Sequence, residues 1–139
     1  MVQPREDVDL TTEEDYNDHK DDLQGLADVA VLGTLNNTGG NAIHAELYMT
    51  PSSSPAYTTA DEVRDNATLL WGPFEVAAGA SKTVGWDESA DLFSTAGKAL
   101  LINEIKGDGK FTVYMIAAEA TYSFEVQNGV LALVLEFAK

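Results

Sequence analysis

Tyr122-Ser-Phe-Glu-Val-Gln-Asn-Gly-Val-Leu-Ala-Leu-Val-Leu-Glu-Phe137 is the stretch of this 139-residue chain that indicates the fold most strongly. Apolar and polar residues alternate before Asn128-Gly129, and nearly all residues after this pair are apolar. An Asn-Gly pair between two such runs is typical of a β-hairpin, because a type I′ turn needs two positive φ angles. Pairing through a two-residue turn places large apolar side chains on one face: Tyr122, Phe124, Val126, Leu131, Leu133 and Leu135. The sequence therefore predicts a hairpin with one buried face.

Two further strands are expected upstream of this stretch, in residues 28–49. A period of two places Val29, Val31 and Leu35 on one face, and a Gly/Asn-rich turn over 36–41 follows. The next strand alternates cleanly, and its apolar face consists of Ile43, Ala45, Leu47 and Met49. These segments predict neighbouring strands in one sheet.

A short acidic helix is expected before these strands, over about 12–24. Thr11 and Glu14 have the spacing of a capping box, and Gly25 can end the helix. Between residues 50 and 66 the sequence shows no firm period and is read as a polar loop. Residues 97–106 fit either a buried strand or a helix, and a helix is favoured.

The remaining segments are strands. Residues 68–76 form an extended run interrupted by Gly72-Pro73, which predicts an edge strand or a bulge. Residues 81–86 form another strand with Val84 and Trp86 on one face, and residues 110–120 form one more. About seven short strands with one or two short helices predict a mainly β chain. We expect residues 1–139 to form a single domain, an antiparallel immunoglobulin-like β-sandwich.

Composition excludes several classes of protein. The net charge of −15 argues against nucleic acid and anionic membrane as partners, because both attract cationic surfaces. The chain contains no cysteine, so it has no disulfide and no thiolate site. No apolar run approaches the roughly 20 residues of a transmembrane helix. The first 28 residues carry ten acidic and two basic side chains, which predicts a solvated acidic surface.

Several segments resemble bacterial immunoglobulin-like β-sandwich domains of exported lipoproteins. They are Val31-Leu-Gly-Thr-Leu-Asn-Asn-Thr-Gly-Gly-Asn-Ala42 with Ala45-Glu-Leu-Tyr-Met49, and Phe74-Glu-Val-Ala-Ala-Gly-Ala-Ser-Lys-Thr-Val84. The opening Asp9-Leu-Thr-Thr-Glu-Glu-Asp-Tyr-Asn-Asp-His-Lys-Asp-Asp-Leu23 is similar to the start of such lipoproteins, where a strand leads into a short acidic helix. The resemblance rests on turns and strands and carries no catalytic residues. It implies an extracellular or cell-envelope location after removal of an export signal; the alternative is a cytoplasmic protein.

Two groups of residues are candidates for binding sites. Asp15, Asp18 and Asp22 could hold calcium, although residues 18–23 lack the glycine that an EF-hand loop needs, and solvated carboxylates are the simpler interpretation. Tyr48, Tyr57 and Trp71 could stack against a sugar or another ligand, whereas core packing is the simpler role for such aromatics. We expect no cofactor.

No motif for a nucleophile, a catalytic metal or a phosphate loop occurs, so we expect no enzymatic activity. Two functions remain. The first is a non-catalytic cell-surface or periplasmic module with a binding or structural role and a protein or carbohydrate partner. The second is a self-assembling filament or extracellular-matrix subunit that works by strand complementation, since the apolar segment 130–137 must be either buried or shared. A homo-oligomer is possible under both.

The acidic segment gives a first test. If its carboxylates are only solvated charges, added NaCl should raise the melting temperature by screening their repulsion, and CaCl₂ at matched ionic strength should do no more. A calcium site would add RT ln(1 + [L]/Kd) to the free energy of unfolding. A calcium-specific rise that Asp18→Asn or Asp22→Asn removes would contradict the screening account.

Overall fold

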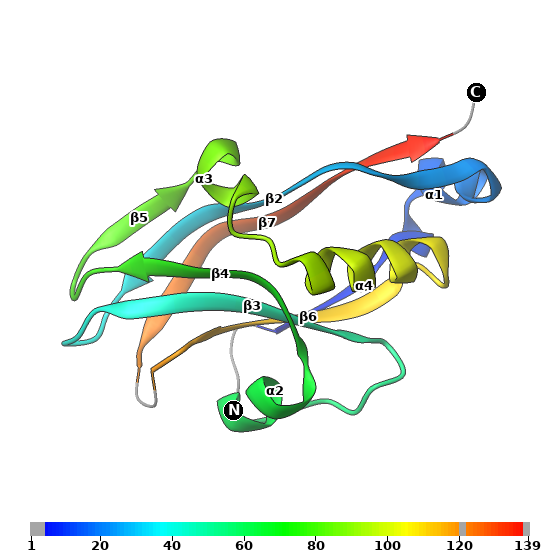
Figure 1. Ribbon diagram of the computed structural model, residues 1–139. Helices are drawn as coiled ribbons and strands as arrows, with labels where there is room; N and C mark the ends of the chain where they lie inside the picture. Colours follow the sequence, from blue (N-terminus) through cyan, green and yellow to red (C-terminus); the bar gives the residue numbers. More distant parts are fainter. Residues whose placement is uncertain (1–4, 120–121, 138–139) are drawn as a thin grey trace.

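The protein is a β-sandwich in a computed structural model that describes residues 5–119 and 122–137 (Figure 1). One antiparallel sheet has four strands in the order β1-β6-β3-β4, and the other has three in the order β5-β2-β7. The strands are β1 (Arg5–Asp9), β2 (Leu23–Asn37), β3 (Ile43–Pro51), β4 (Thr68–Val76), β5 (Ser81–Val84), β6 (Lys110–Ala117) and β7 (Phe124–Phe137). The mainly β, antiparallel sandwich that the sequence predicts is therefore confirmed.

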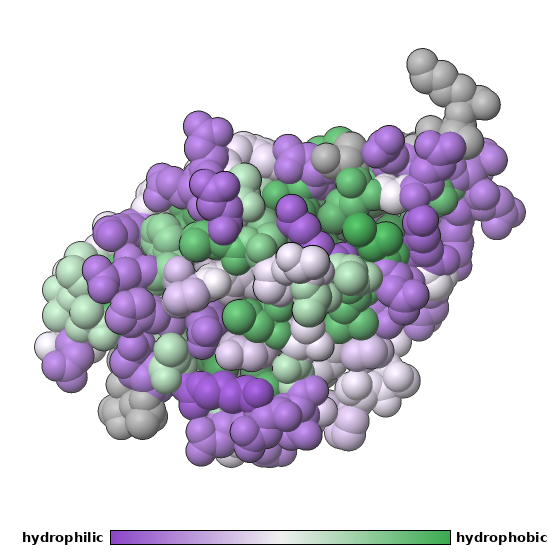
Figure 2. Space-filling model, viewed as in Figure 1, coloured by the Kyte–Doolittle hydropathy of each residue, from purple (hydrophilic) through white to green (hydrophobic). Residues whose placement is uncertain are grey.

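Helices cover the ends and edges of the sandwich and are more numerous than the one or two expected. They are α1 (Glu14–His19), α2 (Ala60–Asn66), α3 (Trp86–Ala90) and α4 (Thr95–Lys106), with short 3₁₀ turns at Leu10–Thr12 and Lys20–Asp22. Hydrophilic side chains gather over α2 and around α1, while apolar surface shows across the middle of the same face (Figure 2). The helix favoured for residues 97–106 is confirmed as part of α4.

The inward faces of the strands follow the predicted alternation. Ile43, Ala45, Leu47 and Met49 of β3 are all buried, and so are Val29, Val31 and Leu35 of β2. β4 lies at the edge of its sheet and pairs irregularly with β3 next to Gly72, as the Gly72-Pro73 pair predicts. Trp86, expected in the core beside Val84, instead begins α3 and is 42 % exposed.

The predicted hairpin over 122–137 is wrong. Residues 124–137 form one continuous strand that pairs with β2 along its length, and Asn128-Gly129 form a β-bulge opposite Gly33. Only Asn128 has a positive φ, of 55°, whereas a type I′ turn needs two such residues. Gly33 has a φ of 140°, and a Cβ there would lie 3.0 Å from the Cα of Gly129, so the bulge requires glycine at this position.

The predicted apolar face survives this correction. The extra residue of the bulge shifts the alternation by one, so Val126 and Leu131 face the same way although they are five positions apart. A two-residue hairpin would also place Val126 and Leu131 on one face, because the two residues would lie opposite each other on paired strands. The inward side chains Phe124, Val126, Leu131, Leu133 and Leu135 pack against the core but are only half-buried.

Two local assignments also change. The acidic helix spans only Glu14–His19, because Leu23 and Leu26 pair with β7 and Gly25 lies within β2. Thr11 does not cap this helix: the N-cap of α1 is Glu13, whose side chain makes no capping hydrogen bond. Thr11 lies in the preceding 3₁₀ turn, where the Asp9 side chain accepts a hydrogen bond from the Thr11 backbone N–H. The loop expected over 50–66 contains α2, whose first turn is capped by the Thr59 hydroxyl accepting from the Glu62 N–H at 3.2 Å.

The buried face of α4 contacts β4 so closely that a glycine is needed. A Cβ on Gly97 would lie 2.5 Å from the Cα of Leu70 and 2.6 Å from the Leu69 carbonyl oxygen, and both are backbone atoms that cannot move independently. The helix therefore depends on Gly97 to reach the sheet.

Gly97→Ala should lower the free energy of unfolding by about 1–3 kcal/mol, the usual cost of overpacking, despite the better helix propensity of alanine. Chemical denaturation measures this. Gly40→Ala is the matched control, because nothing lies within 4 Å of a Cβ built there. Equal stability of the Gly97 variant and the wild type would mean that α4 does not press against β4.

Candidate functional site

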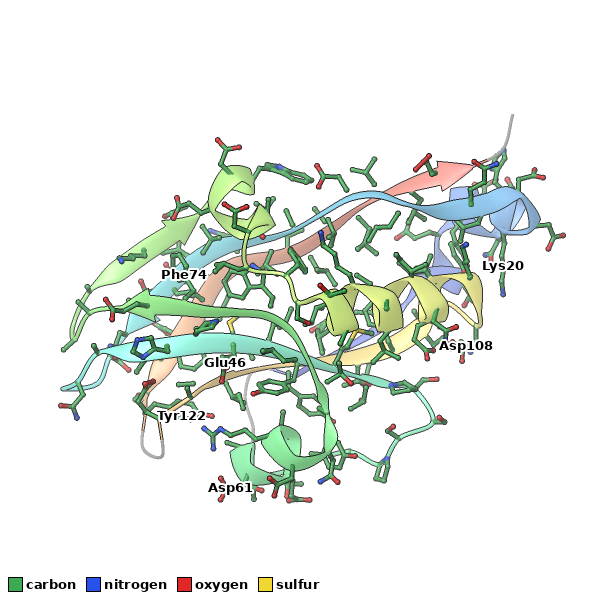
Figure 3. The ribbon with its side chains drawn as sticks, viewed as in Figure 1. Lys20, Glu46, Asp61, Phe74, Asp108 and Tyr122 are labelled. Carbon is green, nitrogen blue, oxygen red and sulfur yellow. The ribbon has the colours of Figure 1, made fainter. Side chains whose placement is uncertain are left out.

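The two sides of the sandwich are built differently, and one of them is closed. On that side β4, which carries Phe74 (labelled in Figure 3), and β5 meet. The Lys82 ammonium lies 5.7 Å from the centre of the Phe74 ring, and the Asn37 side-chain amide donates to the Val76 carbonyl at 3.1 Å. Ser89 of α3 closes it further, because its hydroxyl oxygen accepts from the Val31 N–H at 2.7 Å. These contacts link β5 and β2 to β4, and α3 to β2, along what we call the closed side of the sandwich.

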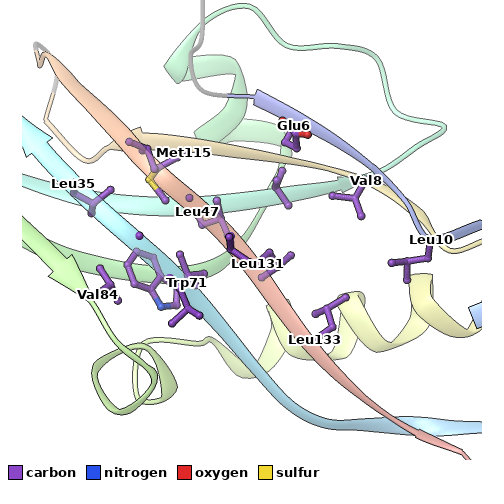
Figure 4. A pocket seen from close by; sticks show the side chains of 17 residues that line it. Glu6, Val8, Leu10, Leu35, Leu47, Trp71, Val84, Met115, Leu131 and Leu133 are labelled. Atoms are coloured by element: carbon purple, nitrogen blue, oxygen red, sulfur yellow. The ribbon is translucent and has the colours of Figure 1, made fainter. Parts of the chain in front are cut away.

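The other side, between β1 and β7, opens into an apolar groove of about 510 Å³ (Figure 4). Strands of both sheets line it, with Val8 and Leu10 at the β1 edge and Leu131 and Leu133 at the β7 edge. Trp71 lies at its floor, fully buried, and its indole N–H donates to the Ser89 carbonyl oxygen at 3.2 Å. The groove is therefore a continuation of the hydrophobic core that reaches the surface.

The number of strands explains the groove. The sheet that contains β1 has four strands, whereas the sheet that contains β7 has three, so one inner face is wider than the other. β6 is covered, with Phe111 only 1 % exposed, but the inward side chains at the edges, such as Val8 and Leu133, remain half-buried. A further strand beside β7 would cover them.

The free edge of β7 is long and apolar. Among the described residues β7 pairs only with β2, so the main-chain groups along its other edge have no strand partner. Val130 and Val134 on its outer face are 53 % and 47 % exposed, and the six residues Val130–Leu135 carry no charge. β7 also lacks the lysine or proline that commonly protects edge strands.

Glu6 carries the only ionisable side chain among the residues that line the groove in the described part of the chain. Alternation along β1 places it on the same inward face as Val8, at the mouth of the groove (Figure 4). The register of β1 with β6 fixes this direction, since Glu6 pairs with Val113 and Val8 with Phe111. The groove thus offers apolar surface, a free strand edge and one carboxylate.

The proposed aromatic platform does not form. Tyr48 and Tyr57 are half-buried beneath α2, where the Tyr57 and Tyr114 ring centres are 6.0 Å apart. Trp71 belongs to the main core and is 0 % exposed. Tyr48 and Tyr57 therefore share one cluster and Trp71 lies in another, where it is unavailable for stacking at the surface.

The acidic candidates lie at the end of the sandwich, on α1 and the turn after it. Asp18 and Asp22 are exposed, and the side chain of Asp15 lies outside the described part of the structure. Within that described part, no group of three or more His, Asp or Glu side chains is arranged so that it could hold a metal ion. The calcium site remains a prediction.

A cluster around His44 was missed by the sequence analysis. His44 Nδ1 lies 2.8 Å from a carboxylate oxygen of Glu119, and its Nε2 lies 3.2 Å from one of Glu75. The hydrogen bond to Glu119 raises the pKa of His44 above its usual value, against the opposing effect of desolvation, and the charges of Glu119 and Glu75 add to the rise. Sheet pairing of His44 with Glu75 is the signal that could have revealed half of this cluster, once the β3–β4 register was known.

This cluster makes stability depend on pH. Because the pKa of His44 is higher in the folded chain, its contribution is complete below the unfolded pKa of about 6.5 and is lost as the pH rises through the folded value. The melting temperature should therefore contain a component that falls over this window and is absent in His44→Gln. An NMR titration of His44 that gives a pKa at or below 6.5 would contradict this.

Comparisons with known proteins add no identity. No protein family, no curated protein and no solved structure matches the chain. No helix in the described residues is both long enough and apolar enough to cross a membrane.

Proposed function

We propose that this protein is a non-catalytic β-sandwich module that holds an extended strand of another polypeptide in the groove between β1 and β7. The observation that carries the proposal is the pairing of a free, apolar strand edge with an apolar groove on the same side of the sandwich. Addition of a strand to an exposed edge is a common mode of peptide recognition, in which main-chain hydrogen bonds supply affinity and side-chain pockets supply specificity.

The chemistry of the groove suits a strand better than a sugar or a reacting substrate. The edge of β7 offers backbone donors and acceptors, while the groove beside it accepts apolar side chains at every second position. Each large apolar side chain that becomes fully buried contributes about 1.5–3 kcal/mol. A sugar would need stacking aromatics and polar partners, and the Trp71 face is inside the core.

The proposal brings together the two functions expected from the sequence. A binding module and a filament subunit would use the same groove and would differ in the protein that supplies the strand. We place the module at the cell surface or in the periplasm because of the resemblance to exported lipoprotein domains.

Peptide binding tests this function. A labelled peptide of about nine residues, alternating Leu or Val with Thr, should bind by fluorescence anisotropy and slow amide hydrogen exchange along β7. The matched control is the same peptide with backbone N-methyl groups at alternate residues. Two versions are made, one methylated at the odd and one at the even residues, so that each version blocks the N–H groups along one edge of the peptide strand. One version should lose binding, because it cannot donate to β7.

Two results would overturn the proposal. The first is equal binding of the unmodified peptide and both N-methylated versions, which would show that the backbone of the peptide is not recognised. The second is the absence of binding by any alternating peptide at millimolar concentration. Protection from exchange outside β7 and β1, with none on β7, would also place the peptide elsewhere.

A further inference from the structure

We infer that the strand held in the groove carries a lysine or arginine on its inward face, opposite Glu6. This inference rests on the proposed strand binding and adds the chemistry by which the groove would select its partner. It follows from the position of one carboxylate and from the distribution of charge around it.

Covering the groove with a strand would change the surroundings of the Glu6 side chain. Its side chain is exposed at the mouth, where water solvates the carboxylate, and it shares the inward face of β1 with Val8. A strand laid beside β7 would remove much of that water. Burying an unpaired carboxylate is costly, so a strand that supplies a cationic donor there avoids a penalty that other strands meet.

Most charged side chains of the strands on either side of the groove are acidic. Beyond Glu6, β1 carries two more acidic residues, Asp7 and Asp9, and one basic residue, Arg5. β7 carries Glu125 and Glu136 near its ends and no basic residue. No lysine or arginine is among the described residues that line the groove. With a net charge of −15, the whole protein attracts a cationic segment and speeds its encounter with the groove.

A second copy of this chain fits less well as the occupant. The β7 strand of a second copy would bring only apolar, neutral polar and acidic side chains to the groove, with no cation for Glu6. The association would also bring together two molecules that each carry a net charge of −15. The charges favour a different, cationic polypeptide.

An inward charge on an edge strand has another possible role, since it can protect a protein against unwanted strand pairing. The two roles predict opposite effects of removing the charge. If Glu6 only protects the edge, Glu6→Gln should tighten the binding of every strand. If Glu6 selects a cation, the same change should weaken the lysine peptide relative to the others.

The experiment uses the alternating peptide with one of its groove-facing residues replaced by Lys, Gln or Glu. The replacement is made at each groove-facing position in turn, in separate peptides. At one position the Lys peptide should bind about fivefold more tightly than the Gln peptide, and the Glu peptide more weakly than both. This preference should shrink with added NaCl. It should disappear in Glu6→Gln and persist in Glu88→Gln, a control that removes one exposed charge on α3.

The outcomes separate the inference from the function on which it rests. Equal binding of the Lys and Gln peptides to the wild type would overturn the inference and leave strand binding intact. Tighter binding of all peptides to Glu6→Gln would also overturn it, in favour of the protective role. Sedimentation of the free protein as a dimer through β7 would assign the groove to a second copy. Failure of every peptide to bind would overturn the proposed function itself.

Discussion

The pairing of β2 with β7 is the constraint on which the rest of the structure depends. These two long strands pair from Leu23–Phe137 to Asn37–Phe124, with shifts in register at three places. β5 adds to the other edge of β2 over only four residues, and where that pairing stops the hydroxyl of Ser89 accepts the Val31 N–H instead. The closed side of the sandwich is thus assembled on β2, while β7 is left at the open side.

Short-range patterns predicted the faces of strands well and their connections poorly. The buried residues of β3 follow from alternation alone, and the edge position of β4 follows from its proline. Asn128-Gly129 misled because a two-residue turn and a bulge give the same division into inward and outward side chains. Which of the two forms depends on whether β2 is free to pair with the whole segment, and no local pattern reports that.

The helices were also predicted incompletely: one was predicted too long, and another was not predicted. Leu23 and Leu26 look like the apolar stripe of the first helix, but pairing with β7 takes them into β2. In contrast, Thr59 and Glu62 have the spacing of a capping box, so α2 could have been found from a signal already present in the sequence. The groove could not be predicted, because alternation gives the direction of side chains and not the number of strands in each sheet.

The bulge has a consequence for how this chain tolerates changes in length. Between Val126 and Leu131 the inward positions stay in phase only because one residue is extra. Loss of a single residue there would turn Phe124 and Val126 outward if the rest of β7 kept its place. If Phe124 and Val126 stayed inward, the residues after the bulge, such as Leu131, would turn outward instead. Substitutions on the outer face of β7 are mild by comparison. The strand is therefore a segment in which residue count is more constrained than residue identity.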